Sequence, residues 1–451
     1  MNHADDDDRF NFPTLSEHGR RMLDFLREHP AAPVFRNRSG NRLLAAEVEQ
    51  AHAFEASTAS ASVGWMPGDR PAWLADHLHR LAEQVPAYRH LQAAPVSRFE
   101  QLPTTSRADL AADITRFVPD DVAIDRLILF STTGTTGQPI TVPSHPVVAA
   151  RYLAFHKRAL RRFGIELRHG RGQVGVVLLG HQRRCFTYVS VTPTMNESGL
   201  VKLNLHPDDW CHVDDRTRYL DALDAEVLAG DPLSFAELLT LPLTTRPRAL
   251  LSVGMMLTAG LRRELETRFA CPVLDLYSMN EAGPIGVFDA AAAGHVLLQP
   301  DLFVEILDQA GTPVPEGEVG EITLTGGFNF CLPLLRYRTG DHAALIRSGH
   351  EPVLRDLQGR KPVRFRCADG RWINNIEVSH ALSPLPLSQF GLDQRLDGSL
   401  LLRLTASAMI HETAARTALH DLFGSAKLSV QSIDGFDKTV QYTSQIDPHA
   451  Q

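Results

Sequence analysis

The sequence contains little cysteine and no long hydrophobic run. Its five cysteines lie far apart in a chain of 451 residues and form no CxxC pair, which argues against a disulfide scaffold and predicts a reduced, cytoplasmic protein. No apolar run approaches the roughly 20 residues of a membrane span, and the acidic start of the chain lacks the basic and apolar regions of a secretory signal. We therefore expect no association with a membrane.

An excess of positive charge is also missing. The formal net charge is -8, so the chain has no general electrostatic attraction to nucleic acid. The hydrophobic content of 43% and the charged content of 22% are ordinary for a globular protein. A chain of this length can bury a large core in about three domains or fewer.

Apolar runs that alternate with helical patterns predict an α/β protein with a largely parallel sheet. The runs at residues 126–130 and 174–179 are typical of buried strands, and Thr258 can cap a helix. After Pro71, apolar residues recur on one helical face, at Trp73, Leu74, Leu78, Leu81 and Val85. Beyond about residue 300 the chain becomes richer in strand patterns. We expect three regions, at residues 1–70 (an N-terminal extension), 71–355 (a large domain) and 356–451 (a small C-terminal domain).

The segment "STTGTTGQP" (131–139) directly follows the first of these predicted strands. Backbone N–H groups of a glycine-rich turn can bind phosphate oxygens, and threonine or serine hydroxyls add further donors. Gly134 and Gly137 permit positive φ and the close approach of a ligand. No lysine follows the second glycine, so this is not the GxxxxGK[ST] nucleotide loop. Alone, such a segment is more often a surface turn; the preceding strand adds support for a ligand site, because ligands gather beyond strand ends in α/β sheets.

The segment resembles the phosphate loop of the adenylate-forming enzymes, a superfamily that includes acyl-CoA synthetases, luciferases and peptide-synthetase adenylation domains. Further stretches resemble one branch, the phenylacetate–CoA ligase and capsule-biosynthesis-like proteins. They occur in the family's order as "QVPAYRHL" (84–91), "LPTTSRADL" (102–110), "LDLYSMNEAG" (274–283), "GTPVPEGEVGEITLT" (311–325) and "LPLLRYRTGD" (332–341). The resemblance implies a large α/β adenylate-forming domain with mainly parallel sheets and a β-rich subdomain, followed by a small, mobile α+β domain.

The same resemblance implies an ATP site. The residues implied for the phosphates are Ser131, Thr132, Thr133, Gly134, Thr135, Thr136 and Gly137. Tyr277 would stack on adenine with Gly254 and Ser278 nearby, Asp341 would accept hydrogen bonds from the ribose hydroxyls, and Arg360 belongs to the hinge segment. Glu281 would hold Mg²⁺, which suits a hard oxygen ligand beside phosphates. Each residue also has a plain structural explanation, for example a core tyrosine at 277 or a turn aspartate at 341.

Lys438, in "GFDKTVQYTS", stands where the family has the lysine that contacts the reacting carboxylate and the α-phosphate. A solvated strand lysine is the alternative. Met255 and Pro284 are the residues implied for the acid substrate. His181 follows an apolar strand and is a further candidate, although a lone histidine there is more often structural. For Arg336 and Arg338, in "RYRTGD", we expect partial burial without a firm role; the alternatives are surface charges and phosphate partners.

Several positions depart from the family pattern. Gln138 replaces a frequent lysine of the loop, and Lys361 stands near where the hinge has an aspartate. Some members of the branch carry zinc on cysteines and a histidine. Here the corresponding positions hold His295, Cys331, Asp289 and Asn329. Because asparagine is a poor zinc ligand, zinc is not expected.

Three hypotheses follow. The leading one is an ATP-dependent, Mg²⁺-requiring ligase that adenylates a small carboxylic acid, with an aromatic acid favoured, and passes the acyl group to coenzyme A or another acceptor such as a carrier protein. The second is an enzyme that activates nitrite to diazotise an aryl amine in specialised metabolism. The third is a non-catalytic nucleotide-binding partner of a biosynthetic complex. The sequence leaves the acid, the final acceptor and the oligomeric state open.

Overall fold

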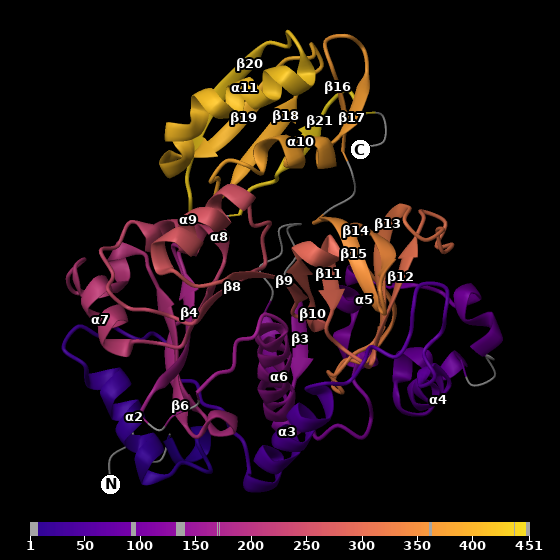
Figure 1. Ribbon diagram of the computed structural model, residues 1–451. Helices are drawn as coiled ribbons and strands as arrows, with labels where there is room; N and C mark the ends of the chain where they lie inside the picture. Colours follow the sequence, from indigo (N-terminus) through magenta and orange to yellow (C-terminus); the bar gives the residue numbers. More distant parts are fainter. Residues whose placement is uncertain are drawn as a thin grey trace. The chain divides into compact units, whose positions relative to one another are not determined.

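The structure, a computed structural model, describes residues 8–91, 96–131, 140–168, 170, 172–359, 363–436 and 438–447. Its contacts divide the chain into two compact units (Figure 1). The first unit comprises Met1–Thr14, Asn41–Glu166 and Leu276–Lys361; the second comprises Leu15–Gly40, Leu167–Asp275 and Pro362–Gln451. The domain boundaries expected near residues 70 and 355 stay a prediction.

The first unit contains an antiparallel sheet with the strand order β12-β13-β14-β15-β11-β10, and the end of β9 lies beside β10. The strands are β9 Val273–Met279, β10 Gly283–Asp289, β11 Gly294–Leu297, β12 Leu302–Leu307, β13 Val319–Gly326, β14 Leu334–Ser348 and β15 Glu351–Gln358. The short strand β1 (Thr105–Ser106) pairs with β14 in parallel. Strands β12 to β15 of this sheet form the strand-rich region that the sequence indicates beyond residue 300.

The α-helices that accompany this sheet include α3 (Ala45–Thr58), α4 (Leu74–Gln84), α5 (Arg107–Ala112) and α6 (Pro146–Arg162). Pro146 occupies the first turn of α6, where its missing N–H costs nothing. Figure 1 shows α3 beside α6, and a buried ion pair joins them, with Lys157 Nζ 2.8 Å from Glu55 Oε2. The predicted helical face after Pro71 is confirmed, since Leu74, Leu78 and Leu81 are buried in the core of this unit.

Short 3₁₀ turns connect these elements, at η1 Pro86–Leu91, η2 Val96–Gln101, η3 Ile114–Phe117, η4 Ile124–Arg126 and η7 Ala290–Ala292. The expected buried strand at 126–130 is wrong in its burial. The strand β2 (Ile128–Ser131) pairs only with β3 (Thr141–Ser144), as a two-stranded ribbon. Because no further strand among the described residues pairs with this ribbon, Leu129 remains 64% exposed.

The second unit contains the parallel sheet that the sequence predicts. Its order is β8-β7-β4-β6-β5, in which only β5 runs antiparallel to its neighbour. The strands are β4 Val174–Gly180, β5 Tyr188–Thr192, β6 Ser198–Asn204, β7 Val227–Gly230 and β8 Ala249–Val253. Every residue of β7 is buried, as expected for a parallel strand covered on both faces.

The helices of this part are α2 Glu17–Glu28, α7 Asp215–Leu223, α8 Pro232–Leu239 and α9 Ala259–Phe269, with the 3₁₀ turns η5 Pro193–Met195 and η6 Pro207–Asp209. The predicted cap of α9 is confirmed, since Thr258 Oγ1 accepts a hydrogen bond from the N–H of Leu261 at 3.3 Å. The N–H of Ser234 likewise donates to Asp231, which caps α8. These caps satisfy N–H groups that a helix start leaves without a partner.

The C-terminal segment of the second unit forms its own small α+β layer (Figure 1, orange to yellow). Its elements are β16 Arg364–Arg366, β17 Trp372–Asn374, α10 Asn375–Leu382, β18 Phe390–Gln394, β19 Leu400–Thr405, η8 Ala406–His411, α11 Glu412–Phe423, β20 Leu428–Ile433 and β21 Tyr442–Ser444. The sheet order is β20-β19-β18-β21. Buried Phe365, Leu402 and Phe423 belong to a core that is specific to this layer.

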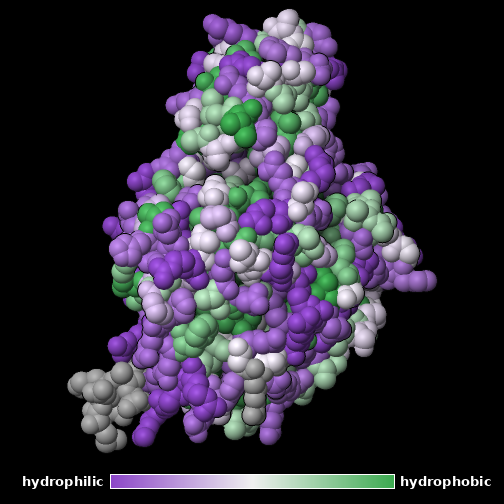
Figure 2. Space-filling model, turned by 60° about the vertical axis from the view of Figure 1, so that its left-hand side comes forward, coloured by the Kyte–Doolittle hydropathy of each residue, from purple (hydrophilic) through white to green (hydrophobic). Residues whose placement is uncertain are grey.

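The α/β fold class predicted from the sequence is confirmed, with a parallel sheet, a β-rich region and a small C-terminal α+β layer. On the face drawn in Figure 2, hydrophilic and hydrophobic residues are interspersed. Among the described residues, every helix is too short or too polar to cross a membrane.

Candidate active site

In the first unit, two predicted nucleotide-binding residues contact each other. Tyr277 lies near the end of β9 and Asp341 lies in β14. The Tyr277 hydroxyl donates to Asp341 Oδ2 at 2.8 Å. Burial, reinforced by the Asp341 carboxylate, holds the pKa of Tyr277 well above its usual range. The phenol therefore stays protonated and serves as a fixed donor, and its ring belongs to the hydrophobic core of the unit.

Glu281, the predicted metal ligand, follows β9 and is only 5% exposed. Its Oε1 accepts hydrogen bonds from Arg107 Nη1 at 3.2 Å and from the Tyr337 hydroxyl at 3.1 Å. Arg107 begins α5, and Tyr337 lies in β14. A buried carboxylate needs such partners, because an uncompensated charge is costly to bury.

The side chain of Arg336 contributes to the packing of the first unit. It is 1% exposed, so the expected partial burial is wrong. Its Nη2 lies 3.1 Å from Glu305 Oε1, and its guanidinium also donates to the carbonyls of Glu100, Leu102 and Gly311. These contacts link β14, which carries Arg336, to β12 and to the earlier segment that contains Glu100 and Leu102.

In the second unit, the carboxyl ends of four neighbouring parallel strands carry polar or predicted site residues. His181 follows β4, His206 follows β6, Asp231 follows β7 and Gly254 follows β8. Parallel strands end at the same edge of a sheet, and this edge is where ligands bind in open α/β sheets. The strand order β8-β7-β4-β6 therefore brings these positions together.

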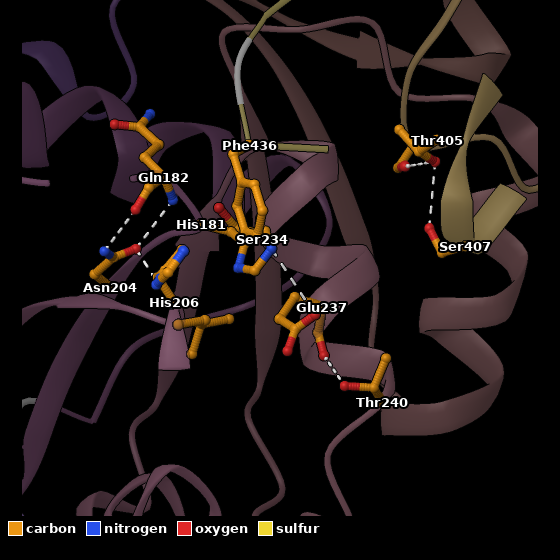
Figure 3. Close-up of polar contacts among 12 residues, drawn as sticks. His181, Gln182, Asn204, His206, Ser234, Glu237, Thr240, Thr405, Ser407 and Phe436 are labelled. Carbon is orange, nitrogen blue, oxygen red and sulfur yellow. Dashed lines mark hydrogen bonds and ion pairs between the residues drawn. The ribbon is translucent and has the colours of Figure 1, made fainter. Parts of the chain in front are cut away.

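His181 is packed against an aromatic ring (Figure 3). The ring centroid of Phe436 lies 4.9 Å from that of His181 and 4.7 Å from that of His206. His181 Nε2 is 3.9 Å from Glu237 Oε2, whereas its Nδ1 is buried and has no hydrogen-bond partner among the described residues. Burial lowers the pKa of His181, which favours the neutral imidazole.

Lys438 and Gly254, both predicted from the sequence, contact each other. The Lys438 Nζ donates to the carbonyl oxygen of Gly254 at 2.8 Å. Gly254 has φ +75°, a left-handed conformation that a glycine adopts without strain. Desolvation lowers the pKa of Lys438, and the negative charge of Asp231 partly offsets this effect. Met255, the next residue, is half-buried.

The remaining predicted residues are distributed as follows. Ser131 is the exposed end of β2, and Ser278 in β9 is paired with the buried Pro284 in β10. Thr132, Thr133, Gly134, Thr135, Thr136, Gly137 and Arg360 lie outside the described residues. Their roles therefore stay predictions.

Two of the four positions considered for zinc bind other partners. Asp289 forms an ion pair with Arg162 at 2.7 Å, and Asn329 Nδ2 donates to the carbonyl of Pro143 at 3.1 Å. Within the described part of the chain, no three His, Cys, Asp or Glu side chains form a group that could hold a metal ion.

Sequence reasoning missed the partners of the predicted residues. Arg107 and Tyr337 lie inside two of the matching segments, but nothing in those segments indicates that both side chains reach Glu281. Phe436 precedes Lys438 by two residues, in a segment that we quoted only for its lysine. A search for aromatic residues beside the lysine would have singled it out.

Residues 43–330 match the family of AMP-binding enzymes. The match covers more than half of the chain, so the protein belongs to this family, and the adenylate-forming class that the motifs predicted is confirmed. The matched residues include Tyr277 in β9 and Glu281. The match ends before Asp341 and Lys438.

The chain is also similar to individual ligases. Phenylacetate-coenzyme A ligase of Pseudomonas putida is 31% identical over 102 residues, which are 22% of this chain and 23% of that protein. The enzyme of the same name from Escherichia coli (strain K12) is 32% identical over 93 residues, which are 20% of this chain and 21% of that protein. The matches thus span less than a quarter of the length of these two relatives.

Solved structures share the fold. A crystal structure of 2-hydroxyisobutyryl-CoA ligase in the postadenylation state with R3-HIB-AMP has a TM-score of 0.57 at 16% identity, over 99% of this chain and 91% of that one. An open conformation of that ligase in complex with 2-HIB-AMP and CoA has a TM-score of 0.54 at 17% identity, over 78% of this chain and 89% of that one. At these identities the likeness concerns the fold alone.

Proposed function

We propose that the protein is an ATP-dependent adenylating ligase that activates a small carboxylic acid and transfers the acyl group to coenzyme A. Membership of the AMP-binding enzyme family supports the nucleotide half of this proposal. The observation that carries the catalytic half is the hydrogen bond from Lys438 to Gly254, because it holds a cation at the carboxyl edge of the parallel sheet. Aromatic acids are favoured, because phenylacetate-coenzyme A ligases are among the relatives.

In the first step, an oxygen of the substrate carboxylate attacks the α-phosphorus of ATP. A bond forms between that oxygen and phosphorus, the bond to the bridging oxygen breaks, and pyrophosphate leaves. Negative charge develops on the phosphoryl oxygens, and a positioned ammonium group such as that of Lys438 stabilises it. In the second step, the thiol of coenzyme A attacks the acyl carbon, AMP leaves and the thiol proton passes to solvent.

The nucleotide would be bound by a carboxylate and an aromatic side chain of the first unit. Asp341 presents a carboxylate that can accept hydrogen bonds from ribose hydroxyls, and the Tyr277 hydroxyl fixes its orientation. Adenine would stack against the ring of Tyr277, as the family resemblance implies. In the second unit, His181 and Met255 would border the acid. Orientation of the two reactants supplies a further part of the rate enhancement.

The family implies Mg²⁺, and the residues fit it. Mg²⁺ in nucleotide sites is bound through one or two carboxylates together with substrate phosphates, and Glu281 is a buried carboxylate whose contacts from Arg107 and Tyr337 both use the same oxygen, Oε1. Glu281 would hold the ion. When bound, Mg²⁺ neutralises negative charge on the phosphates.

ATP–pyrophosphate exchange tests this proposal across aryl acids, short branched acids, and nitrite with aryl amines. Exchange stimulated by an acid, followed by acid-dependent loss of free coenzyme A thiol, is the expected result. Thioester formation on a carrier protein instead of coenzyme A would identify the carrier protein as the acyl acceptor. AMP formation that depends on nitrite and consumes the amine would favour the diazotising alternative, and tight ATP binding without exchange would favour a non-catalytic nucleotide-binding protein.

A further inference from the structure

The segment that carries Lys438 is anchored on both sides of the lysine. It joins β20 to β21, and we call Asp434, Gly435, Phe436, Lys438 and Thr439 of this segment the lysine loop. On one side, Asp434 forms an ion pair with Arg183, which comes just after β4. On the other side, the N–H of Thr439 donates to Gln389 Oε1 at 3.1 Å.

Phe436 supplies a third anchor. Its ring contacts two imidazoles at the strand ends, with centroid distances of 4.9 Å to His181 and 4.7 Å to His206 (Figure 3). The guanidinium carbon of Arg183 lies 5.4 Å from the centroid of the same ring. Arg183 therefore contacts two members of the loop, through an ion pair and over an aromatic face.

These contacts have a geometric consequence for the lysine. A lysine side chain has four rotatable carbon bonds, and its amine is placed only as well as the backbone that carries it. Anchors at positions 434, 436 and 439 fix that backbone before and after Lys438, while the carbonyl of Gly254 fixes the amine itself. Supporting contacts of this kind determine how precisely a functional group is presented.

We propose that Arg183, Asp434 and Phe436 are positioning residues, which hold the lysine loop on the strand ends so that the Lys438 amine is presented at Gly254. The proposal rests on the proposed function, which gives the Lys438 amine its role in adenylate formation. None of the three residues needs to touch the reacting atoms.

Charge exchange tests the ion pair. Arg183→Asp and Asp434→Arg should each reduce ATP–pyrophosphate exchange about 10- to 100-fold, because displacement of a reacting group by about 1 Å is that costly. The double variant restores the opposite charges and should return to within about threefold of wild type. Arg184→Ala, at the exposed neighbouring arginine, is the matched control and should leave exchange unchanged. Equal losses in the single and double variants would overturn the proposal.

A double-mutant comparison tests Phe436. Phe436→Ala should reduce exchange about 10-fold or more in the wild-type background, but less than about twofold in the Lys438→Ala background, because the residue acts through the lysine. Phe436→Trp keeps an aromatic ring and should retain most activity. A similar loss in both backgrounds would identify a merely structural role.

Hydrogen exchange of the loop amides gives a readout that needs no substrate. Phe436→Ala and Arg183→Asp should increase the exchange rate of the Thr439 amide several-fold, and the charge-exchanged double variant should restore its protection. Unchanged protection in all variants would overturn the anchoring. If the wild-type protein lacks exchange activity with every acid but the amide responds as expected, the proposed function fails while the anchoring of the loop holds.

Discussion

The candidate residues of the two units differ in how their charges are balanced. In the first unit, Glu281 and Asp341 accept hydrogen bonds from side chains of buried strands or helix starts. In the second unit, the cation Lys438 is carried on a loop, and its acceptor is a backbone carbonyl. The first arrangement is preorganised by the core, whereas the second depends on a few loop contacts. Variants in the first unit should therefore affect stability strongly, and variants in the lysine loop should affect mainly the rate.

The largest expected effect is on the stability of the first unit. Arg336→Leu leaves Glu305 as a buried charge without its ion-pair partner, and it should reduce the free energy of unfolding by about 3–5 kcal/mol. Urea or guanidinium unfolding measures the change. Arg336→Leu combined with Glu305→Leu removes both charges and should recover part of the loss. A loss below about 1 kcal/mol in the single variant would contradict the assigned role.

The second expected effect is a lower reaction rate with a nearly unchanged free energy of unfolding. Lys438→Ala should reduce ATP–pyrophosphate exchange about 10²- to 10³-fold, the usual cost of removing a preorganised donor. Its free energy of unfolding should stay within about 0.5 kcal/mol of wild type, as for a surface substitution. Lys427→Ala, at an exposed lysine of the same unit, is the control and should change neither quantity. Unaltered exchange in Lys438→Ala would remove this lysine from the catalytic assignment.

A buried histidine gives the first unit a pH-dependent stability. Burial lowers the pKa of His77 to about 4, although its ring nitrogen contacts the Leu334 carbonyl. Between about pH 6.5 and pH 4 this histidine is protonated in the unfolded chain but neutral in the folded chain. The free energy of unfolding therefore decreases as the pH falls, by about 2 kcal/mol at pH 5.

His77→Gln removes this titration and should flatten the decrease in the free energy of unfolding between pH 7 and pH 5. Unfolding curves at several pH values measure the slope. His79→Gln, at an exposed histidine of the same helix, serves as the control. A decrease of equal slope in His77→Gln would contradict the assignment.

The smallest expected effect concerns the pH profile of activity. Protonated Lys438 is the form that the mechanism needs, so exchange should decline as the pH rises through its lowered pKa. The nearby Asp231 carboxylate raises that pKa. Asp231→Asn keeps a side chain able to cap α8 but removes the charge, and it should move the alkaline limb to lower pH. The pH dependence of exchange measures this shift, and a limb that moves upward would contradict the proposed coupling.

The regular parts of the fold were predictable because they depend on local patterns. The run at 174–179 became β4 (Val174–Gly180), and Thr258 caps α9 as its neighbours indicated. The burial of β2 was mispredicted, because hydrophobicity alone does not reveal that, in the described part of the chain, this strand pairs with β3 alone. Burial depends on the layers around a strand, which a single segment does not encode.

The motifs proposed the members of the candidate site but did not indicate the contacts between them. Motifs indicated Tyr277, Asp341, Gly254 and Lys438, and the structure joins them in two pairs. The pairing of Lys438 with Gly254 spans 184 positions, and that of Arg183 with Asp434 spans 251. Such contacts follow from the order of strands and the path of connecting loops, so neither composition nor local spacing reveals them.

The acceptor of the Lys438 amine is a peptide oxygen, and this limits how mutation can alter the contact. Every amino acid has a carbonyl group, so no substitution at position 254 removes the acceptor itself. A substitution can change only where the oxygen points, through the cost of keeping φ at +75° with a side chain present. Variation at this position would therefore tune the direction of the amine while leaving its chemistry intact.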